Sequence, residues 1–122
     1  MAGIIRVEKE IPEVLILSNN YWGDEKMIAI IAKLKIKSGM EEKAAYATLR
    51  MADQVNKQEK ECLYYEPYMT AEGTGEIFIL EKYTGMEALE KHRNSLHYKE
   101  FGETLKDALE GPPEVQMLKA LS

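Results

Sequence analysis

The chain has 122 residues, enough for one domain with one hydrophobic core. Its 16 Lys and Arg residues against 21 Asp and Glu residues give a formal net charge of −5, and this acidic balance argues against a nucleic-acid partner. The single cysteine, Cys62, excludes an intramolecular disulfide and a cysteine-based zinc cluster.

No stretch approaches the roughly 20 apolar residues of a membrane span, so we expect no membrane partner. The first residues, MAGIIRVEKE, mix charged with apolar positions and do not fit a secretory signal. We therefore expect a reducing, cytoplasmic location.

Residues 1–26 are predicted to be an N-terminal extension. Residues 14–17 are an apolar run and a short strand candidate, and Tyr21 and Trp22 need burial. We expect an ordered arm that packs on the rest of the chain or on a partner subunit. Residues 27–122 are expected to form one domain.

The domain opens with a predicted strand at residues 27–36, where apolar residues alternate at period two. The start of this strand is apolar on both faces, so both faces must be covered. Ser38 is predicted to cap a helix over residues 40–58, with Glu41 as its reciprocal partner.

Two further strands are predicted at residues 62–69 and 76–83, joined by a hairpin loop with two glycines. Pro67 cannot donate a hydrogen bond to a sheet, so the strand at residues 62–69 should lie at an edge. One face of the strand at 76–83 carries Ile77, Ile79, Glu81 and Tyr83, and the other carries Phe78 and Leu80.

A second helical region follows Gly85. Leu89, His92 and Leu96 fall on one stripe. After a jog expected near residues 94–95, His97, Phe101 and Leu105 continue a related stripe. The Gly-Pro-Pro sequence at residues 111–113 ends this helix, and residues 114–121 are predicted to form a fourth strand.

The order strand, helix, strand, strand, helix, strand predicts an α+β fold. It is typical of a ferredoxin-like βαββαβ sandwich, with a four-stranded antiparallel sheet and both helices on one face. The other sheet face is left bare. Because Ile28, Leu80 and Tyr83 cannot all lie in water, we expect two sheets to face each other in a homodimer.

The segment that begins at Glu81, EKYTGMEALEKHRNSLHYKEF, resembles the antibiotic biosynthesis monooxygenase family. That family's pattern is E-x-W, then a helix with A-L-x-x-H, then an aromatic residue followed by x-x-F. The segments MIAIIAKLKIKSGMEEK and ECLYYEPYM resemble its first strand and helix and its G-C-L-x-Y strand. The resemblance covers residues 27–118 and implies a dimeric α/β barrel.

Members of that family include cofactor-free oxygenases of quinols and anthrones, haem-degrading enzymes and an isomerase of a sugar phosphate. Here Tyr83 replaces the family's Trp and Glu61 replaces its Gly, and the missing Trp argues against haem degradation. The sequence has no flavin, nicotinamide or phosphate-loop motif. We therefore expect a cofactor-independent monooxygenase that uses O₂ and a quinol or anthrone-like aromatic substrate. A non-oxidative isomerase or a small-ligand binding protein is the alternative, and haem binding comes third.

His92 is the first catalytic candidate, because its stripe directs it at the sheet, where a neutral imidazole could take a proton from a phenol or quinol. A buried histidine bonded to Glu81 or to a backbone carbonyl is the alternative. Tyr83 is the second catalytic candidate, as a positioning group. The expected substrate-binding residues are His97, Tyr65, Phe78, Glu81 and Phe101. For the aromatic ones core or dimer packing is the alternative, for His97 a hydrogen bond that fixes the helix jog, and for Glu81 a partner to His92 or to a Lys or Arg in the dimer. No metal site is expected, since neither histidine has a carboxylate or cysteine at ligand spacing.

Overall fold

The computed structural model describes residues 26–121 of the chain. In chain order, its elements are strand β1 (Ile28–Lys35), helix α3 (Glu41–Gln58), strands β2 (Cys62–Met69) and β3 (Glu76–Tyr83), helices α4 (Met86–Arg93) and α5 (Leu96–Leu105), and strand β4 (Glu114–Lys119). The arm expected at residues 1–26 lies outside the described residues, apart from its last position.

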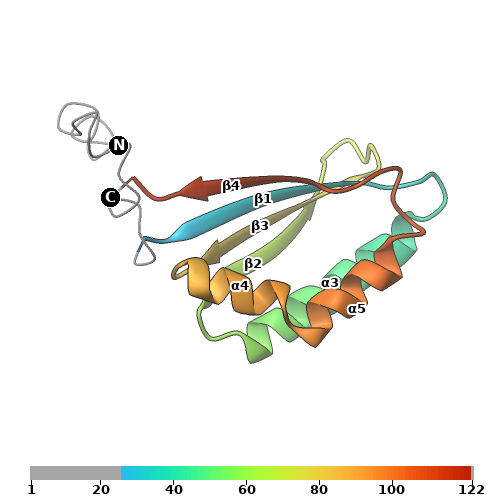
Figure 1. Ribbon diagram of the computed structural model, residues 1–122. Coiled ribbons are helices and arrows are strands. Elements are labelled where there is room, and N and C mark those ends of the chain that lie inside the picture. The colour runs from blue at the N-terminus through green and yellow to red at the C-terminus, as the bar shows by residue number, and fades with distance from the viewer. Residues whose placement is uncertain (1–25, 122) are drawn as a thin grey trace.

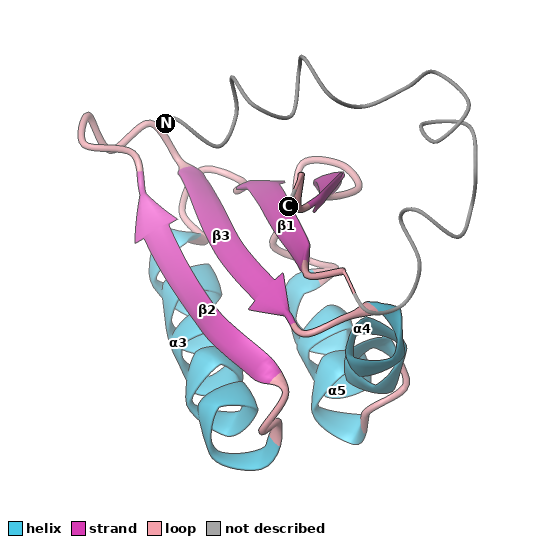
Figure 2. Ribbon diagram, turned by 90° about the vertical axis from the view of Figure 1, so that its left-hand side faces the viewer, coloured by secondary structure: helices cyan, strands magenta, loops and turns pink. Residues whose placement is uncertain are grey.

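The four strands form one antiparallel sheet in the order β2-β3-β1-β4. The three helices lie on one side of this sheet (Figure 1), and α3 runs beside the α4–α5 pair (Figure 2). This arrangement confirms the ferredoxin-like α+β sandwich. β2 lies at a sheet edge, as Pro67 requires. Within residues 26–121, no helix is long and apolar enough to cross a membrane.

The core lies between the sheet and the helices. Alternate residues of β1 and β3 point toward the helices, and α3 meets them with mostly small side chains at helical spacing. Alanines let the helix approach the sheet closely. The buried residues of α3 are Ala44, Ala47, Thr48, Met51, Ala52 and Val55.

The far face of the sheet is open. Ile28 and Tyr83 do not belong to it, contrary to the prediction, because both are fully buried on the helix side. Strand alternation instead puts Ile31 and Leu80 on the open face, where they are register partners and half-buried. Further apolar side chains of this face are Ala29, Tyr64, Tyr68, Phe78 and Leu118.

Helix α3 begins without a side-chain cap, so the predicted cap from Ser38 is wrong. Gly39 has a φ of +90°, a conformation that favours glycine, and its N–H donates to Oε1 of Glu41 at 2.8 Å. The Glu41 carboxylate therefore stabilises the turn before the helix instead of closing a reciprocal cap.

The jog expected near residues 94–95 is a full break between α4 and α5. Oγ of Ser95 accepts from the N–H of Tyr98 at 3.2 Å and so caps α5, while its O–H donates to the carbonyl of His92 at 2.7 Å. The break resets the helical phase. Leu96 is 70% exposed, contrary to the predicted stripe, and His97 turns inward.

Candidate functional site

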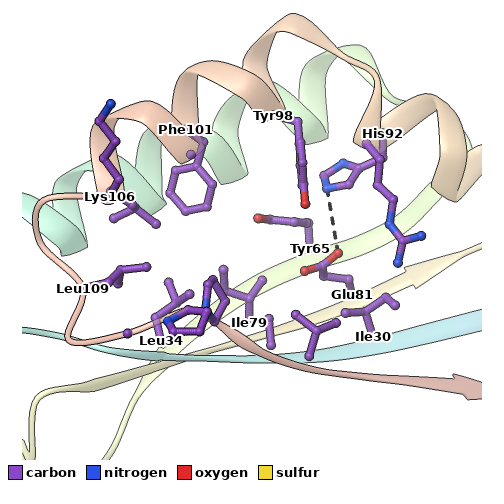
Figure 3. A pocket seen from close by; sticks show the side chains of 18 of the residues that line it. Ile30, Leu34, Tyr65, Ile79, Glu81, His92, Tyr98, Phe101, Lys106 and Leu109 are labelled. Atoms are coloured by element: carbon purple, nitrogen blue, oxygen red, sulfur yellow. Dashed lines mark ion pairs between the residues drawn. The ribbon is translucent and has the colours of Figure 1, made fainter.

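A cavity of about 800 Å³ lies between the sheet and the α4–α5 pair. Its walls are mostly apolar, with Ile30, Leu34 and Ile79 from the sheet facing Phe101 from α5 (Figure 3). Leu89 from α4 also lines it. A volume of this size accommodates a small multi-ring molecule. Apolar walls of this kind favour a ligand with a large apolar surface.

The polar lining groups gather around His92. Figure 3 shows His92 from α4, Tyr98 from α5, and Tyr65 and Glu81 from the sheet converging there. The ring of His92 lies 5.7 Å from that of Tyr65 and 5.1 Å from that of Tyr98, measured between centroids. Arg93 adds a cation beside Glu81. The cavity therefore offers hydrogen-bonding groups at the site where a ligand hydroxyl or carbonyl could be held.

Glu81 is the buried carboxyl of this cluster. Burial raises its pKa, and the hydrogen bond from the hydroxyl of Tyr83, 2.6 Å from Oε1, only partly offsets that effect. Tyr83 itself is fully buried behind Glu81 and does not line the cavity. Its pKa is raised, mainly by burial and then by the Glu81 charge. Tyr83 therefore positions Glu81 and stays protonated.

Glu59 fixes the orientation of the His92 ring. Its Oε2 lies 2.9 Å from Nδ1 of His92. A carboxylate only accepts, so Nδ1 carries the proton; in the neutral tautomer with this arrangement, the lone pair of Nε2 lies on the other side of the ring. There Nε2 lies 3.9 Å from Oε1 of Glu81 (Figure 3). The expected partners of a buried His92 were Glu81 or a backbone carbonyl, but its hydrogen-bond partner is Glu59.

Glu59 also binds His97. Oε2 accepts from Nε2 of His97 at 2.5 Å, so one carboxylate serves both imidazoles. Burial raises the pKa of Glu59, but the hydrogen bonds to His92 and His97 outweigh it, and the net pKa is lowered. The Glu59 N–H caps α3 by donating to the carbonyl of Val55 at 2.9 Å. These contacts lock the three side chains in place.

The remaining predicted site residues divide between three locations. Tyr65 and Phe101 line the cavity. His97 lines a second groove, between α3 and α5, and does not line the cavity. Phe78 lies on the open sheet face, where Nζ of Lys33 sits 5.8 Å from its ring centroid. The residues around His92 that the sequence analysis missed are Glu59, Arg93 and Tyr98.

Glu59, His92 and His97 can also be considered as metal ligands. Their ligating atoms lie within 4.8 Å of one another. The expectation of no metal site rested on the lack of a carboxylate near the histidines in sequence. The fold supplies one from the end of α3, so that argument does not hold.

Glu81→Gln tests the buried carboxyl. Because its pKa is higher in the folded chain than in the unfolded one, ionising Glu81 opposes folding once the pH rises above the ordinary value of 4.5. Glutamine keeps an oxygen for the Tyr83 hydroxyl and removes this cost. We expect Glu81→Gln to raise Tm by roughly 2 to 5 °C at pH 7.5, with the gain vanishing near pH 4. A gain in Tm that is the same at pH 7.5 and pH 4 would contradict a raised pKa for Glu81.

Cys62 is predicted to be an unreactive thiol. Burial, followed by the nearby charges of Glu59 and Glu81, raises its pKa to about 12. The thiolate is the species that alkylates. Iodoacetamide at pH 8 should therefore modify Cys62 at least about 10-fold more slowly in the folded protein than in urea. Mass spectrometry measures both rates. Equal alkylation rates in the folded protein and in urea would contradict a buried Cys62 with a raised pKa.

Comparison with known proteins identifies the family. The model of the antibiotic biosynthesis monooxygenase family matches residues 27–104, well over half of the chain. The chain belongs to this family. Among curated proteins, none matches the chain. The match confirms the resemblance found in the sequence.

Solved structures agree with this membership. A protein from Caulobacter crescentus that is assigned by name to the antibiotic biosynthesis monooxygenases is 26% identical, with a TM-score of 0.77, over 84% of this chain and 95% of its own. Rv0793 from Mycobacterium tuberculosis is 27% identical, with a TM-score of 0.73, over 79% and 96%. A Nitrosomonas europaea protein, 18% identical with a TM-score of 0.74 over 81% and 93%, shows the fold alone.

Proposed function

We propose that this family member is a cofactor-independent monooxygenase of a quinol or anthrone-like aromatic substrate. The observation that supports this most directly is the apolar cavity with His92 and Glu81 at its polar cluster. A phenol ring would pack against Ile79, Leu89 and Phe101, with its hydroxyl at Nε2 of His92.

His92 and Glu59 act together in the proposed reaction. Nδ1–H of His92 donates to Glu59, so Nε2 is free to take the proton of the substrate hydroxyl. The phenolate that results is electron-rich and reacts with O₂. One oxygen atom joins a ring carbon, the other leaves as water, and the substrate supplies the electrons. Deprotonation, orientation and an apolar pocket are the contributions required of the protein.

The proposal includes a homodimer built through the open sheet face. Seven apolar side chains lie on that face, with Ile31 and Leu80 as neighbours near its middle. An apolar patch that spans four strands is a common protein–protein interface. The proposed enzyme works in the cytoplasm, which suits a chain with one free thiol.

Oxygen uptake tests the proposed activity. Chelator-treated protein is mixed with a panel of reduced quinones and anthrones, and O₂ consumption is compared with autoxidation. We expect uptake above autoxidation with at least one bicyclic or tricyclic substrate. If instead a substrate is isomerised, or a ligand is held without O₂ uptake, the non-oxidative alternative replaces this proposal. A specific Soret shift on haem addition would favour haem binding.

A further inference from the structure

A second site with a different chemistry lies on the other side of His92. Glu59, His92 and His97 come from the C-terminal end of α3, from α4 and from α5, and their side chains converge on one point. The side chains are 14%, 3% and 8% exposed. Such a set of two imidazole nitrogens and one carboxylate binds divalent transition metals, and three ligands leave a position for water.

The ligand atoms are close to metal-binding distances already. Two ligand atoms of one tetrahedral Zn²⁺ lie about 3.3 Å apart. Oε2 of Glu59 is 2.9 Å from Nδ1 of His92 and 2.5 Å from Nε2 of His97, and no pair of ligating atoms exceeds 4.8 Å. An ion would replace the two shared protons. To reach about 3.3 Å, Oε2 of Glu59 would have to move less than about 1 Å away from each of these two ring nitrogens.

Glu81 provides an outer-sphere partner. A histidine that binds a metal usually donates its other ring N–H to a carboxylate, which fixes the ring and strengthens the ligand. Nε2 of His92, on the side of the ring away from Glu59, faces Oε1 of Glu81 at 3.9 Å. This separation is too long for a hydrogen bond, so Glu81 would serve as the outer carboxylate only after a small movement of either side chain.

An entry path is present as well. His97 lines a groove of about 690 Å³ between α3 and α5, whose other lining residues include the exposed Tyr46 and Arg50. This groove gives an ion a route toward His97 that does not run through the cavity. The proposed metal site therefore opens to its own groove, although it shares His92 with the cavity.

We propose that Glu59, His92 and His97 form a binding site for a divalent transition-metal ion such as Zn²⁺ or Co²⁺. When Nδ1 of His92 binds the ion, Nε2 keeps a proton and becomes a donor toward Glu81 and the cavity. Metal occupancy thus changes His92 from an acceptor to a donor. In the proposed oxygenase, it would block the base.

Cobalt titration tests the site without any substrate. Chelator-treated full-length protein at pH 7.5 is titrated with Co²⁺, and the visible absorption of four- or five-coordinate Co²⁺ is followed. We expect saturation at one ion per chain. Glu59→Gln and His97→Asn each remove one ligand and should weaken binding by about 100-fold or more. Glu103→Gln is the matched control, because this exposed carboxylate lines the same groove and is not a ligand.

Circular dichroism confirms that each variant is folded. Independently of any variant, Zn²⁺ should shift the NMR signals of Nδ1 of His92 and Nε2 of His97 in the unmodified protein. Co²⁺ affinity that is the same in His97→Asn and Glu103→Gln as in the unmodified protein would overturn the proposal. Unchanged imidazole nitrogen signals at saturating Zn²⁺ would overturn it too. Either result leaves the proposed oxygenase unaffected.

Discussion

His92→Ala should lower the turnover of the oxygenase substrate by about 100-fold, in line with the loss of a general base. The variant removes Nε2, the group proposed to take the substrate's proton. The initial rate of O₂ uptake at saturating substrate is the measurement. Because His92 is 2% exposed, its removal could disturb the fold. Circular dichroism and size-exclusion chromatography of the variant therefore accompany the rate measurement.

Leu96→Ala is the control for His92→Ala. Leu96 lies just past the helix break and is 70% exposed, so its substitution should leave the rate unchanged. His92→Asn supplies a folded polar variant in case the alanine variant is unstable. Turnover that is unchanged in a folded His92 variant would remove this residue from the mechanism.

Leu80→Lys should turn the proposed dimer into a monomer. Leu80 pairs with Ile31 in register on the open sheet face, so two copies of the new lysine would be buried close together at a symmetric interface. An unpaired buried charge costs several kcal/mol, and the dimer dissociation constant should rise by about 100-fold or more. Sedimentation velocity over a range of protein concentrations measures this change.

The control for Leu80→Lys is Tyr46→Lys. Tyr46 lies on α3, on the helix side of the fold, and is 66% exposed. The same charge change there should leave the sedimentation coefficient unaltered. An unmodified protein that sediments as a monomer at about 100 μM would show that the open face is not a dimer interface of the usual size.

The order of strands and helices could be predicted because strand alternation, helical spacing and turn residues are features of short sequence segments. Period-two alternation in β3 correctly put Glu81 on one face with Ile77, Ile79 and Tyr83, but it did not say which face the helices cover. The same alternation puts Phe78 on the opposite face, so its inclusion among the substrate-binding residues already conflicted with the predicted strand. Pro67 likewise indicated the edge position of β2.

The surroundings of His92 could not be predicted in the same way. Glu59 follows the last turn of α3 and carries no motif, and its contact with His92 depends on how α3 packs against the α4–α5 pair. The inward stripe through His97 after the break was predicted, but the exposure of Leu96 at the start of α5 was not. The contact between Glu59 and His92 depends on tertiary packing, which a local sequence pattern does not show.

Oxygen labelling is the most direct measurement of whether this protein is a monooxygenase. A substrate found by O₂ uptake is turned over by chelator-treated protein under isotopically heavy O₂, and the product is analysed by mass spectrometry. We expect one heavy oxygen atom in each product molecule and none when only the water is heavy. A product that forms without heavy oxygen from O₂ would contradict the proposed function.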